Sequence, residues 1–348
     1  MCSKPPSALS PQPSALIKLA IIIVSWNTRE LLRRAIITAQ ESLASSDIRY
    51  ELVVVDNASQ DGTPAMLQVE FSTVRLIEAG SNLGFAGGNN LALRALLEAE
   101  PPPEYLLLLN PDTETIGAAI PILVRFLDTH LDVAVVGPQL RYPDGSVQSS
   151  RRRFPDRGVF FFESTPLETY LPQNRWARRY RMDDLPADHE QDVDWLMGAA
   201  LLVRSAAIRR AGLLDQGFVM YSEELEWQQR IRRSGVRGQG SEQDFPSAAN
   251  RIVYLPAAKI IHHEGQSSDQ APARRYAQFH QSRLRYVRMT LGPPHALGLW
   301  VFLLLAYGTE LVLEAAKWLA GHKRALRAQR VRVYGVFLRA LLRGPNRT

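Results

Sequence analysis

The segment Tyr105–Asp112, Y-L-L-L-L-N-P-D, contains four consecutive leucines followed at once by polar residues. Four leucines in a row show neither the alternation of a half-exposed strand nor the length of a helix. They therefore predict a strand buried on both faces of a parallel sheet. Ligands of open α/β sheets bind beyond the carboxyl ends of the strands. Asn110 and Asp112 fall at such an end, and Asp112 is the first candidate site residue.

Three more apolar runs precede this segment, and each leads into a segment with helical spacing. The runs are Leu19–Ser25, Leu52–Val55 and Val74–Ile77, and the predicted helices are Arg29–Leu43, Thr63–Phe71 and Leu91–Ala99, the last one after a Gly/Asn-rich loop over Gly80–Asn90. Repeated units of this length predict an α/β fold with a mostly parallel, doubly wound sheet and flanking helices. The polar residues that follow the runs should gather along one sheet edge: Ser25, Asn27, Asp56, Asn57, Asn82, Asn110 and Asp112.

The second half of the chain is less regular. We predict helices near Ile116–Leu127, from Glu223 after a capping Ser222, and over Arg274–Met289, strands over Val133–Leu140, Val193–Val203 and Ile252–Ile261, a turn at Pro143–Gly145 and a flexible insertion over Gly238–Asn250. Residues 151–190 are irregular and charged. Their basic clusters, Arg151–Arg153 and Arg175–Arg181, are either a solvated loop or a grip on an anionic acceptor.

The composition is that of an ordinary folded protein, with 348 residues, 46% of them hydrophobic and 22% charged. This length predicts one large domain with a smaller appendage. The single cysteine, Cys2, excludes a disulfide framework and favours a reducing, cytoplasmic setting. Met1–Ala15 is rich in proline and serine without an apolar core, so we expect a disordered tail rather than a signal peptide.

The net charge of +6 is unevenly distributed, because the chain from Ala315 onward has nine basic residues and no acidic one. An enzyme that acts on nucleic acid more often spreads positive charge over its working face, so we expect no nucleic-acid partner. A basic segment beside an apolar helix favours an anionic membrane surface. The alternative is that the tail packs onto the enzyme body or onto a second subunit in a homodimer.

The apolar part of this tail, Ala296–Thr309, has fourteen residues, fewer than the ~20 that span a bilayer. Continuing the helix places Glu310, Glu314 and Lys317 on one stripe, which predicts an amphipathic helix on a membrane surface. Val331–Leu342 adds a second basic and apolar segment. We therefore expect a protein that is peripheral on the cytoplasmic face of the cell membrane.

Two common phosphate-binding loops are missing from the sequence. There is no G-x-x-x-x-G-K-[ST], and Gly84, Gly87 and Gly88 do not form G-x-G-x-x-G after a strand, which argues against a P-loop NTPase and a nicotinamide dehydrogenase. A bound diphosphate then needs another counterion, and a divalent cation held by Asp112 is the usual answer. The alternative is that Asp112 only opens the next helix. Asp56 either accepts hydrogen bonds from a base or ribose, or only shapes its turn.

Several other polar or aromatic residues have both a functional and a structural interpretation. Glu223, Glu224 and Glu226 either stabilise a helix N-terminus or provide a general base for a sugar hydroxyl. His262 and His263 follow a strand, where one of them can bind a metal or simply be structural. Trp195 either stacks on a sugar or belongs to the core.

Eight motifs, taken together and in order, resemble family 2 glycosyltransferases, in particular their rhamnosyltransferase-like branch. They are I-I-I-V-S-W-N-T, V-V-V-D-N-A-S-Q-D-G, N-L-G-F-A-G-G-N-N, L-L-L-L-N-P-D-T, V-V-G-P-Q-L-R-Y-P-D-G-S, G-A-A-L-L-V-R, F-V-M-Y-S-E-E-L-E and I-I-H-H-E-G-Q-S-S. The resemblance runs from about Lys18 to Met289. We accordingly divide the chain into a tail (1–17), a catalytic domain (18–290, with a nucleotide-sugar half to 130 and an acceptor half from 131) and a basic helical tail (291–348).

The resemblance implies a GT-A fold, a nucleotide-diphosphate sugar donor, Mg²⁺ or Mn²⁺, inversion at the anomeric carbon, and a saccharide or lipid-linked acceptor. Asp56 matches the family's base-binding aspartate, Asp112 the last aspartate of its D-x-D metal motif, Glu224 its catalytic base with Glu223 before it, and His262 and His263 its histidine pair. We further expect the donor to contact Ser25, Asn27, Asn82, Gly84, Asn89 and Asn110, and the acceptor to contact Trp195, Gly198 and Glu226.

The chain departs from the family pattern at four positions. Asn110 replaces the first acid of D-x-D, Glu224 is one methylene longer than the usual aspartate, Gly88 stands where many relatives have arginine, and Glu264 stands where this branch often has glycine. The alternatives to a metal-dependent glycosyltransferase are a non-catalytic subunit that binds a nucleotide sugar, and a nucleotidyltransferase. The second alternative lacks a glycine-rich, basic phosphate loop after its first strand.

Overall fold

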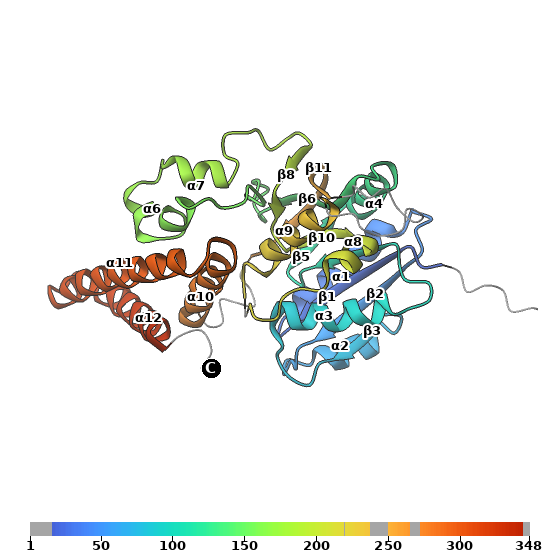
Figure 1. The fold of residues 1–348 in the computed structure, drawn as a ribbon. Coiled ribbons are helices and arrows are strands. Elements are labelled where there is room, and N and C mark those ends of the chain that lie inside the picture. The colour runs from blue at the N-terminus through green and yellow to red at the C-terminus, as the bar shows by residue number, and fades with distance from the viewer. Residues whose placement is uncertain (1–15, 219, 237–249, 265–271, 344–348) are drawn as a thin grey trace, which may run out of the picture.

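The fold is described from a computed structural model, which places residues 16–218, 220–236, 250–264 and 272–343 (Figure 1). The expected disordered tail and the expected insertion at Gly238–Asn250 lie almost wholly outside these ranges. The chain builds a central sheet with helices on both faces. Three further helices, α10 (Pro272–Leu291), α11 (Pro293–Leu319) and α12 (Arg324–Arg343), form a separate layer at one end of the molecule.

The central sheet has nine strands in the order β3-β2-β1-β4-β10-β6-β11-β5, and β8 pairs with β11. Its first half is parallel and consists of β1 (Leu19–Ser25), β2 (Tyr50–Asp56), β3 (Arg75–Glu78) and β4 (Tyr105–Leu109). The second half is mixed, because β10 (Ala200–Arg204) runs antiparallel to both β4 and β6 (Val133–Arg141). β11 (Arg251–His262) runs parallel to β6 and antiparallel to β5 (Thr113–Ile116). The predicted mostly parallel, doubly wound sheet is confirmed.

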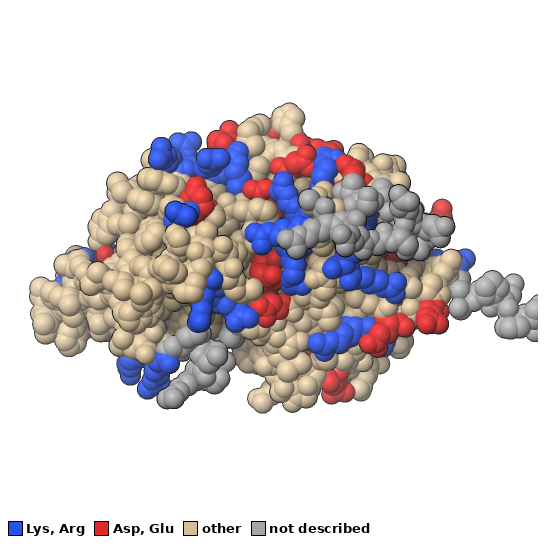
Figure 2. All heavy atoms as spheres, in the orientation of Figure 1, with Lys and Arg blue, Asp and Glu red and all other residues tan. Residues whose placement is uncertain are grey.

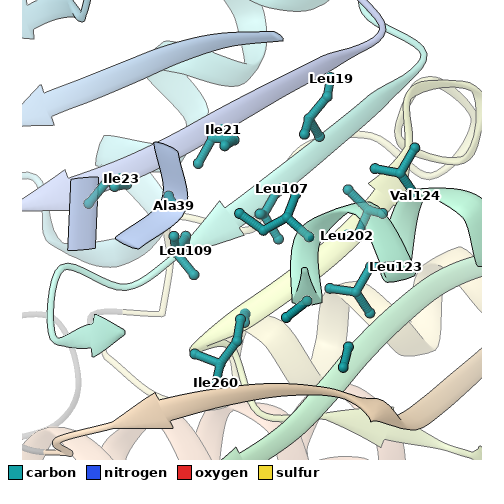
Figure 3. Packing of buried hydrophobic residues seen from close by; sticks show 14 of the residues in the cluster. Leu19, Ile21, Ile23, Ala39, Leu107, Leu109, Leu123, Val124, Leu202 and Ile260 are labelled. Atoms are coloured by element: carbon teal, nitrogen blue, oxygen red, sulfur yellow. The ribbon is translucent and has the colours of Figure 1, made fainter. Parts of the chain in front are cut away.

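The four leucines of β4 are buried on both faces, as predicted. Leu107 and Leu109 join a core under α1 (Arg29–Leu43) and α4 (Ala119–Thr129), as Figure 3 shows. Leu106 and Leu108 join the opposite core, under α3 (Gly84–Leu97), α8 (Ser205–Ala211) and α9 (Glu223–Val236). None of the four is more than 3% exposed. Alternate side chains of one strand therefore anchor both layers of helices.

The helix α3 begins at Gly84, so the prediction of a loop up to Asn90 is wrong. Its glycines permit close packing instead of a flexible loop. A Cβ atom on Gly88 would lie 2.6 Å from Cγ1 of Val24, so only glycine lets the helix approach β1 this closely. Tertiary packing thus outweighs the low helix propensity of glycine.

The single strand predicted over Val193–Val203 is also wrong. The segment is broken into β8 (Gln191–Val193), β9 (Trp195–Leu196) and β10. β9 leaves the main sheet and pairs with β7 (Arg151–Arg152). At the break, a Cβ on Gly198 would lie 3.3 Å from Cζ of Phe85, a tight contact, and 3.6 Å from Cβ of Glu224, an ordinary one.

Two more boundaries differ from the sequence predictions. The helix expected from Ile116 begins at Ala119, and β5 comes before it. The charged region 151–190 contains three short helices, α5 (Val159–Phe162), α6 (Pro166–Tyr170) and α7 (Arg175–Tyr180). The remaining predicted elements are present, including α2 (Thr63–Glu70) and a turn in which Gly145 has φ of +84°.

The C-terminal helices pack against the body through a third core, in which Phe160, Trp195 and Leu225 meet Leu299 and Leu303 of α11. The helix α11 has 27 residues and, among the described residues, is the one helix long and apolar enough to cross a membrane, by length and composition. The helix is therefore longer than the fourteen-residue apolar segment, and its attachment to a membrane surface stays a prediction. Glu314 is 1% exposed and binds Arg327 of α12 through both carboxylate oxygens, so part of the expected charged stripe is an interhelical contact.

Candidate active site

Polar side chains at the ends of β1, β2 and β4 meet along one edge of the sheet, as predicted. Ser25 and Asp56 are paired residues of β1 and β2, and β4, the strand on the other side of β1, leads through Asn110 to Asp112. All but Asn110 are at most 6% exposed. Asn110 is held by its backbone, because its N–H donates to the carbonyl of Ala199.

Asp56 has one carboxylate oxygen engaged and one available. Its Oδ2 accepts a hydrogen bond from the N–H of Ser59 at 3.0 Å, which shapes the turn. Its Oδ1 is buried and has no hydrogen-bond partner in the described part of the chain, and the same is true of Oδ1 of Asn57. A buried carboxylate oxygen without a partner is costly unless a ligand donates to it. This arrangement fits recognition of an N–H or O–H group of a base or ribose.

Three asparagines at this edge use their side chains to hold backbone. Oδ1 of Asn27 accepts from the N–H of Gln60 at 2.8 Å, and Oδ1 of Asn82 accepts from the N–H of Gly84 at 2.9 Å. Nδ2 of Asn89 donates to the carbonyl of Phe85 at 2.9 Å. Asn27 and Asn82 thus shape loops at this edge, whereas the hydrogen bond of Asn89 lies within helix α3.

Asp112 lies at the end of a chain of four side chains that starts at Glu264. Nε2 of Gln148 donates to Oε2 of Glu264 at 2.8 Å, which orients the amide. Oε1 of Gln148 then faces Nδ1 of His262 at 3.0 Å. Nε2 of His262 lies 3.4 Å from Oδ1 of Asp112. His262 and Asp112 are 5% and 6% exposed.

This chain determines which ring nitrogen of His262 holds the proton. An amide oxygen only accepts hydrogen bonds, so Nδ1 of the ring must donate to Gln148. In a neutral imidazole, Nε2 then has a lone pair, and it faces a carboxylate oxygen of Asp112. Two acceptors at this distance repel each other unless a cation or a second proton lies between them. Ligand atoms each about 2.1 Å from a divalent ion can lie this far apart.

The second histidine of the pair has a different partner. Nε2 of His263 lies 2.9 Å from Oε1 of Glu114. The other carboxylate oxygen of Glu114, Oε2, accepts a hydrogen bond from Arg34. Its backbone N–H donates to the carbonyl of Asp112 at 2.9 Å. His263 therefore positions the strand end, and His262 is the histidine that faces Asp112. No group of three or more His, Cys, Asp or Glu side chains that could hold a metal occurs among the described residues, so the protein offers an ion two side-chain ligands here.

A cavity of about 520 Å³ opens beside this chain, and Glu264 and Glu224 both line it. Oε2 of Glu224 is enclosed and has no hydrogen-bond partner among the described residues. Burial raises the pKa of Glu224 to about 7. A carboxylate with a pKa near neutrality can accept a proton and release it again.

The other two acids of this helix differ from Glu224 in their surroundings. Glu223 is 3% exposed, and burial followed by the charge of Glu224 raises its pKa well above the usual value. Glu226 forms two hydrogen bonds with Arg230, at 2.9 and 2.7 Å. Glu226 is thus engaged in a structural ion pair, and of the three acids only Glu224 lines the cavity.

The residues before Glu224 have unusual backbone geometry. Tyr221 and Ser222 have φ of +69° and +68°, a region that residues other than glycine rarely occupy. Both side chains line the cavity. Strain of this kind often accompanies functional sites, because the surrounding structure must hold it. Here it turns the start of α9 so that Glu224 faces the cavity.

The sequence of the first half matches a known family model, that of "Glycosyl transferase family 2", over residues 20–192. The chain is also 30% identical over 272 residues to the N-acetylglucosaminyl-diphospho-decaprenol L-rhamnosyltransferase of Mycobacterium tuberculosis, which covers 76% of this chain and 82% of that protein. This chain belongs to glycosyl transferase family 2. It is a glycosyltransferase, and the predicted resemblance to the rhamnosyltransferase-like branch is confirmed.

Two further proteins are similar to this family 2 glycosyltransferase. The rhamnosyltransferase WbbL of Escherichia coli is 24% identical over 281 residues, which is 77% of this chain and 91% of WbbL. A solved structure is that of the mannosyltransferase PcManGT of Pyrobaculum calidifontis in complex with GDP-Man and Mn²⁺. It is 16% identical to this chain, the match covers 98% of this chain and 90% of the PcManGT chain, and the TM-score is 0.49.

The remaining predicted residues of the glycosyltransferase lie around the cavity or close to it. Trp195 lines it, and its ring N–H donates to the carbonyl of Arg153 at 3.2 Å, so it belongs to both the core and the cavity wall. Gly198 faces Glu224, as described above. Sequence reasoning missed Gln148, which no motif singles out. It also missed the aromatic wall that Tyr276 and Phe279 of α10 contribute.

Proposed function

We propose that this protein is an inverting, metal-dependent glycosyltransferase that moves a sugar from a nucleoside-diphosphate donor to a saccharide or lipid-linked saccharide acceptor. One observation carries the proposal. The bare Nε2 of His262 and the carboxylate of Asp112, 3.4 Å apart at the sheet edge, are connected through Gln148 and Glu264 to the cavity that holds Glu224. The proposed cation site is thus linked through Gln148 to Glu264, which lines the same cavity as the proposed base, Glu224.

Asp112 and His262 would hold Mg²⁺ or Mn²⁺ through a carboxylate oxygen and a ring nitrogen. With only two ligands from the protein, such an ion keeps coordination positions for water and phosphate oxygens. It would supply positive charge to the leaving diphosphate. The protein's own part is orientation, because Gln148 and Glu264 fix the ring of His262.

Glu224 is the proposed general base. The acceptor hydroxyl oxygen forms a bond with the anomeric carbon while the bond from that carbon to the diphosphate oxygen breaks. The hydroxyl proton passes to Glu224, and the nucleoside diphosphate leaves with the bonding electrons. A single displacement of this kind inverts the anomeric carbon. The pKa of about 7 suits both uptake and release of the proton.

The donor would lie across the ends of β1, β2 and β4. The free Oδ1 of Asp56 is proposed to accept from the base or ribose. The loops held by Asn27 and Asn82, and Asn89 in α3, are proposed to contact the donor at the same edge. Ser25, Gly84 and Asn110 border the same edge. Trp195, Gly198 and Glu224 face the acceptor, and Glu226 supports the helix through Arg230.

The names of the relatives suggest the substrate class. Two are rhamnosyltransferases, and one name includes a sugar joined through diphosphate to a polyprenol. We propose rhamnose as the sugar, a lipid-linked acceptor, and a role in cell-surface polysaccharide synthesis on the cytoplasmic side of the membrane. The basic tail supports peripheral attachment, because Lys323, Arg324 and Arg332 are exposed on α12 and the turn that precedes it.

A donor screen tests this proposal. Uridine-, thymidine- and guanosine-diphosphate sugars are incubated with Mg²⁺ or Mn²⁺ and a polyprenyl-diphosphate saccharide, and release of nucleoside diphosphate is measured. We expect turnover of one donor by the wild type and its loss in Glu224→Gln, which still binds the donor. If the wild type binds a donor tightly but releases no diphosphate with any acceptor, the protein is a non-catalytic assembly subunit instead.

A further inference from the structure

A second hollow lies beside the catalytic cavity, between α5, the end of α10 and the start of α11. Its volume is about 250 Å³. We call it the α11 groove, and the residues that line it include Arg157, Phe160, Leu291, Pro294, Gly298 and Leu299. Its floor is buried, since Phe160 and Leu299 are 5% and 1% exposed. Gly298 and Pro294 lie at its open side.

The α11 groove is adjacent to the catalytic cavity, because Phe160 lines both. Arg152 and Arg283 also line the catalytic cavity, and the guanidinium carbon of Arg283 lies 5.5 Å from the ring centre of Phe160. Arg283 is ion-paired with Glu163, whereas Arg152 has no carboxylate within 4.0 Å among the described residues. A further basic side chain, Arg157, is exposed at the groove itself.

The two adjoining hollows thus combine a carboxylate base, guanidinium groups, one of which lies beside the shared Phe160, and a mostly hydrocarbon surface. A lipid-linked saccharide acceptor carries three groups that match these surfaces, namely a sugar hydroxyl, a diphosphate and a hydrocarbon chain. Guanidinium groups bind phosphate oxygens, and apolar walls bind hydrocarbon. The match extends over three chemically distinct regions.

The hydrocarbon surface continues beyond the groove along α11. Leu297, Val301 and Leu305 follow at intervals of four residues and are 60%, 42% and 67% exposed. Figure 2 shows the uncharged surface at the end of the molecule where α11 lies. A chain that leaves the groove would therefore stay in contact with apolar side chains.

We propose that the α11 groove binds the part of the acceptor's hydrocarbon chain nearest its diphosphate. This inference rests on the proposed function, because it assumes that the acceptor is lipid-linked. The groove would let the enzyme distinguish a lipid-linked saccharide from a free one, and it would place the reacting hydroxyl at Glu224 by holding the other end of the molecule. Each methylene buried in the groove is expected to tighten binding roughly four-fold.

Two glycines of α11 provide a matched pair of variants. A Cβ on Gly298 or on Gly308 would meet no atom within 4 Å, so both positions accept a side chain. Both also lie on the same helix, where replacing glycine does not lower helix propensity. Gly298 lines the α11 groove and Gly308 does not. Gly298→Phe therefore fills the groove, and Gly308→Phe is the control.

The experiment measures binding of farnesyl diphosphate by calorimetry, with a chelator present so that the proposed metal site is not loaded. We expect the affinity of Gly298→Phe for farnesyl diphosphate to be at least ten-fold lower than the affinities of the wild type and of Gly308→Phe. Inorganic pyrophosphate should bind all three proteins alike. Equal affinity of the three proteins for farnesyl diphosphate would overturn the inference. So would equally tight, groove-dependent binding of dodecylphosphocholine, because the groove would then accept membrane lipid chains in general.

Turnover provides a second readout that separates this inference from the proposed function. With a polyprenyl-linked acceptor, Gly298→Phe should raise KM about ten-fold with kcat unchanged, and with the same saccharide diphosphate on a methyl group it should have no effect. If the wild type turns over both acceptors and Gly298→Phe changes neither, the groove assignment fails while the glycosyltransferase activity stands. If the wild type turns over neither acceptor, the proposed acceptor class fails. The groove assignment is then judged by binding alone, and it also fails if Gly298→Phe and the wild type bind farnesyl diphosphate equally tightly.

Discussion

Nε2 of His262 lies 3.4 Å from Oδ1 of Asp112, and in the neutral ring the hydrogen bond from Nδ1 to Gln148 leaves a lone pair on Nε2. Both atoms are therefore ready to bind a cation at the edge of the sheet. Metal-binding histidines commonly donate their second N–H to a group that fixes the ring, and replacing that group lowers metal affinity by about 10- to 100-fold.

Gln148→Leu tests the role of this second contact. Without the amide oxygen, the ring of His262 can rotate and the proton can move to Nε2. We expect Mn²⁺ affinity, followed by electron paramagnetic resonance, to fall about 10- to 100-fold while the fold is retained. Gln139→Leu is the control, because Gln139 is also buried but donates to Tyr254 and to the carbonyl of Ala187. Equal losses in both variants would contradict a specific role for Gln148.

Glu224 and Glu226 provide a direct comparison of two acids on one helix. Glu224→Gln keeps the shape of the side chain but removes the proton acceptor, so kcat should fall by about 10²- to 10⁴-fold. Glu226→Gln weakens only the contact with Arg230 and should leave kcat within a few-fold of wild type. Steady-state kinetics with a saturating donor measures both values. A larger loss in Glu226→Gln than in Glu224→Gln would show that the base is assigned to the wrong residue.

The raised pKa of Glu224 predicts the pH dependence of the reaction. The base must be ionised to accept a proton, and burial raises its pKa to about 7, so kcat should be half-maximal near pH 7 and fall about ten-fold per unit below it. The stability effect has the opposite direction. A raised carboxyl pKa contributes stability below its unfolded value of 4.5, and this contribution is lost as the pH rises through about 7.

Glu224→Gln separates this effect from other titrations. Denaturant unfolding of the wild type should show that the free energy of unfolding decreases between about pH 4.5 and 7. The decrease should be smaller in Glu224→Gln, but not absent, because the pKa of Glu223 is also raised. A wild-type kcat that is flat from pH 5 to 8 would contradict the proposed base.

The basic tail predicts binding to anionic membranes. Replacing Lys323, Arg324 and Arg332 with glutamate should weaken binding to vesicles that contain phosphatidylserine, because each basic residue near such a surface contributes about 1 kcal/mol. Sedimentation with vesicles measures the bound fraction, and neutral phosphatidylcholine vesicles are the control. Undiminished binding of the triple variant to the anionic vesicles would contradict an electrostatic role of these three residues at the membrane.

Apolar runs and the polar residues that follow them were enough to predict the strands of the central sheet and the edge at which the candidate site lies. Four consecutive leucines favoured a buried strand, and polar residues directly after such strands were expected at the sheet edge, which located Asp112 and Asp56. The helix from Gly84 was not predictable from propensity, because it forms where glycine allows the close approach of Gly88 to Val24.

The least predictable parts of the site depend on contacts between distant segments. Gln148 meets His262 from 114 positions away in the chain, and no motif connects the two residues. Glu223, Glu224 and Glu226 look alike in sequence. They differ only in what surrounds them, namely the cavity beside Glu224 and the guanidinium group of Arg230 beside Glu226.

The central claim is that Asp112 and His262 hold a divalent cation on which donor turnover depends. Release of nucleoside diphosphate by the wild type, first with excess chelator and then with Mg²⁺ or Mn²⁺ restored, tests it most directly. We predict no turnover with chelator, full recovery on adding the metal, and little recovery in Asp112→Ala at any metal concentration. Full turnover with chelator present, or recovery in Asp112→Ala equal to that of the wild type, would contradict the claim.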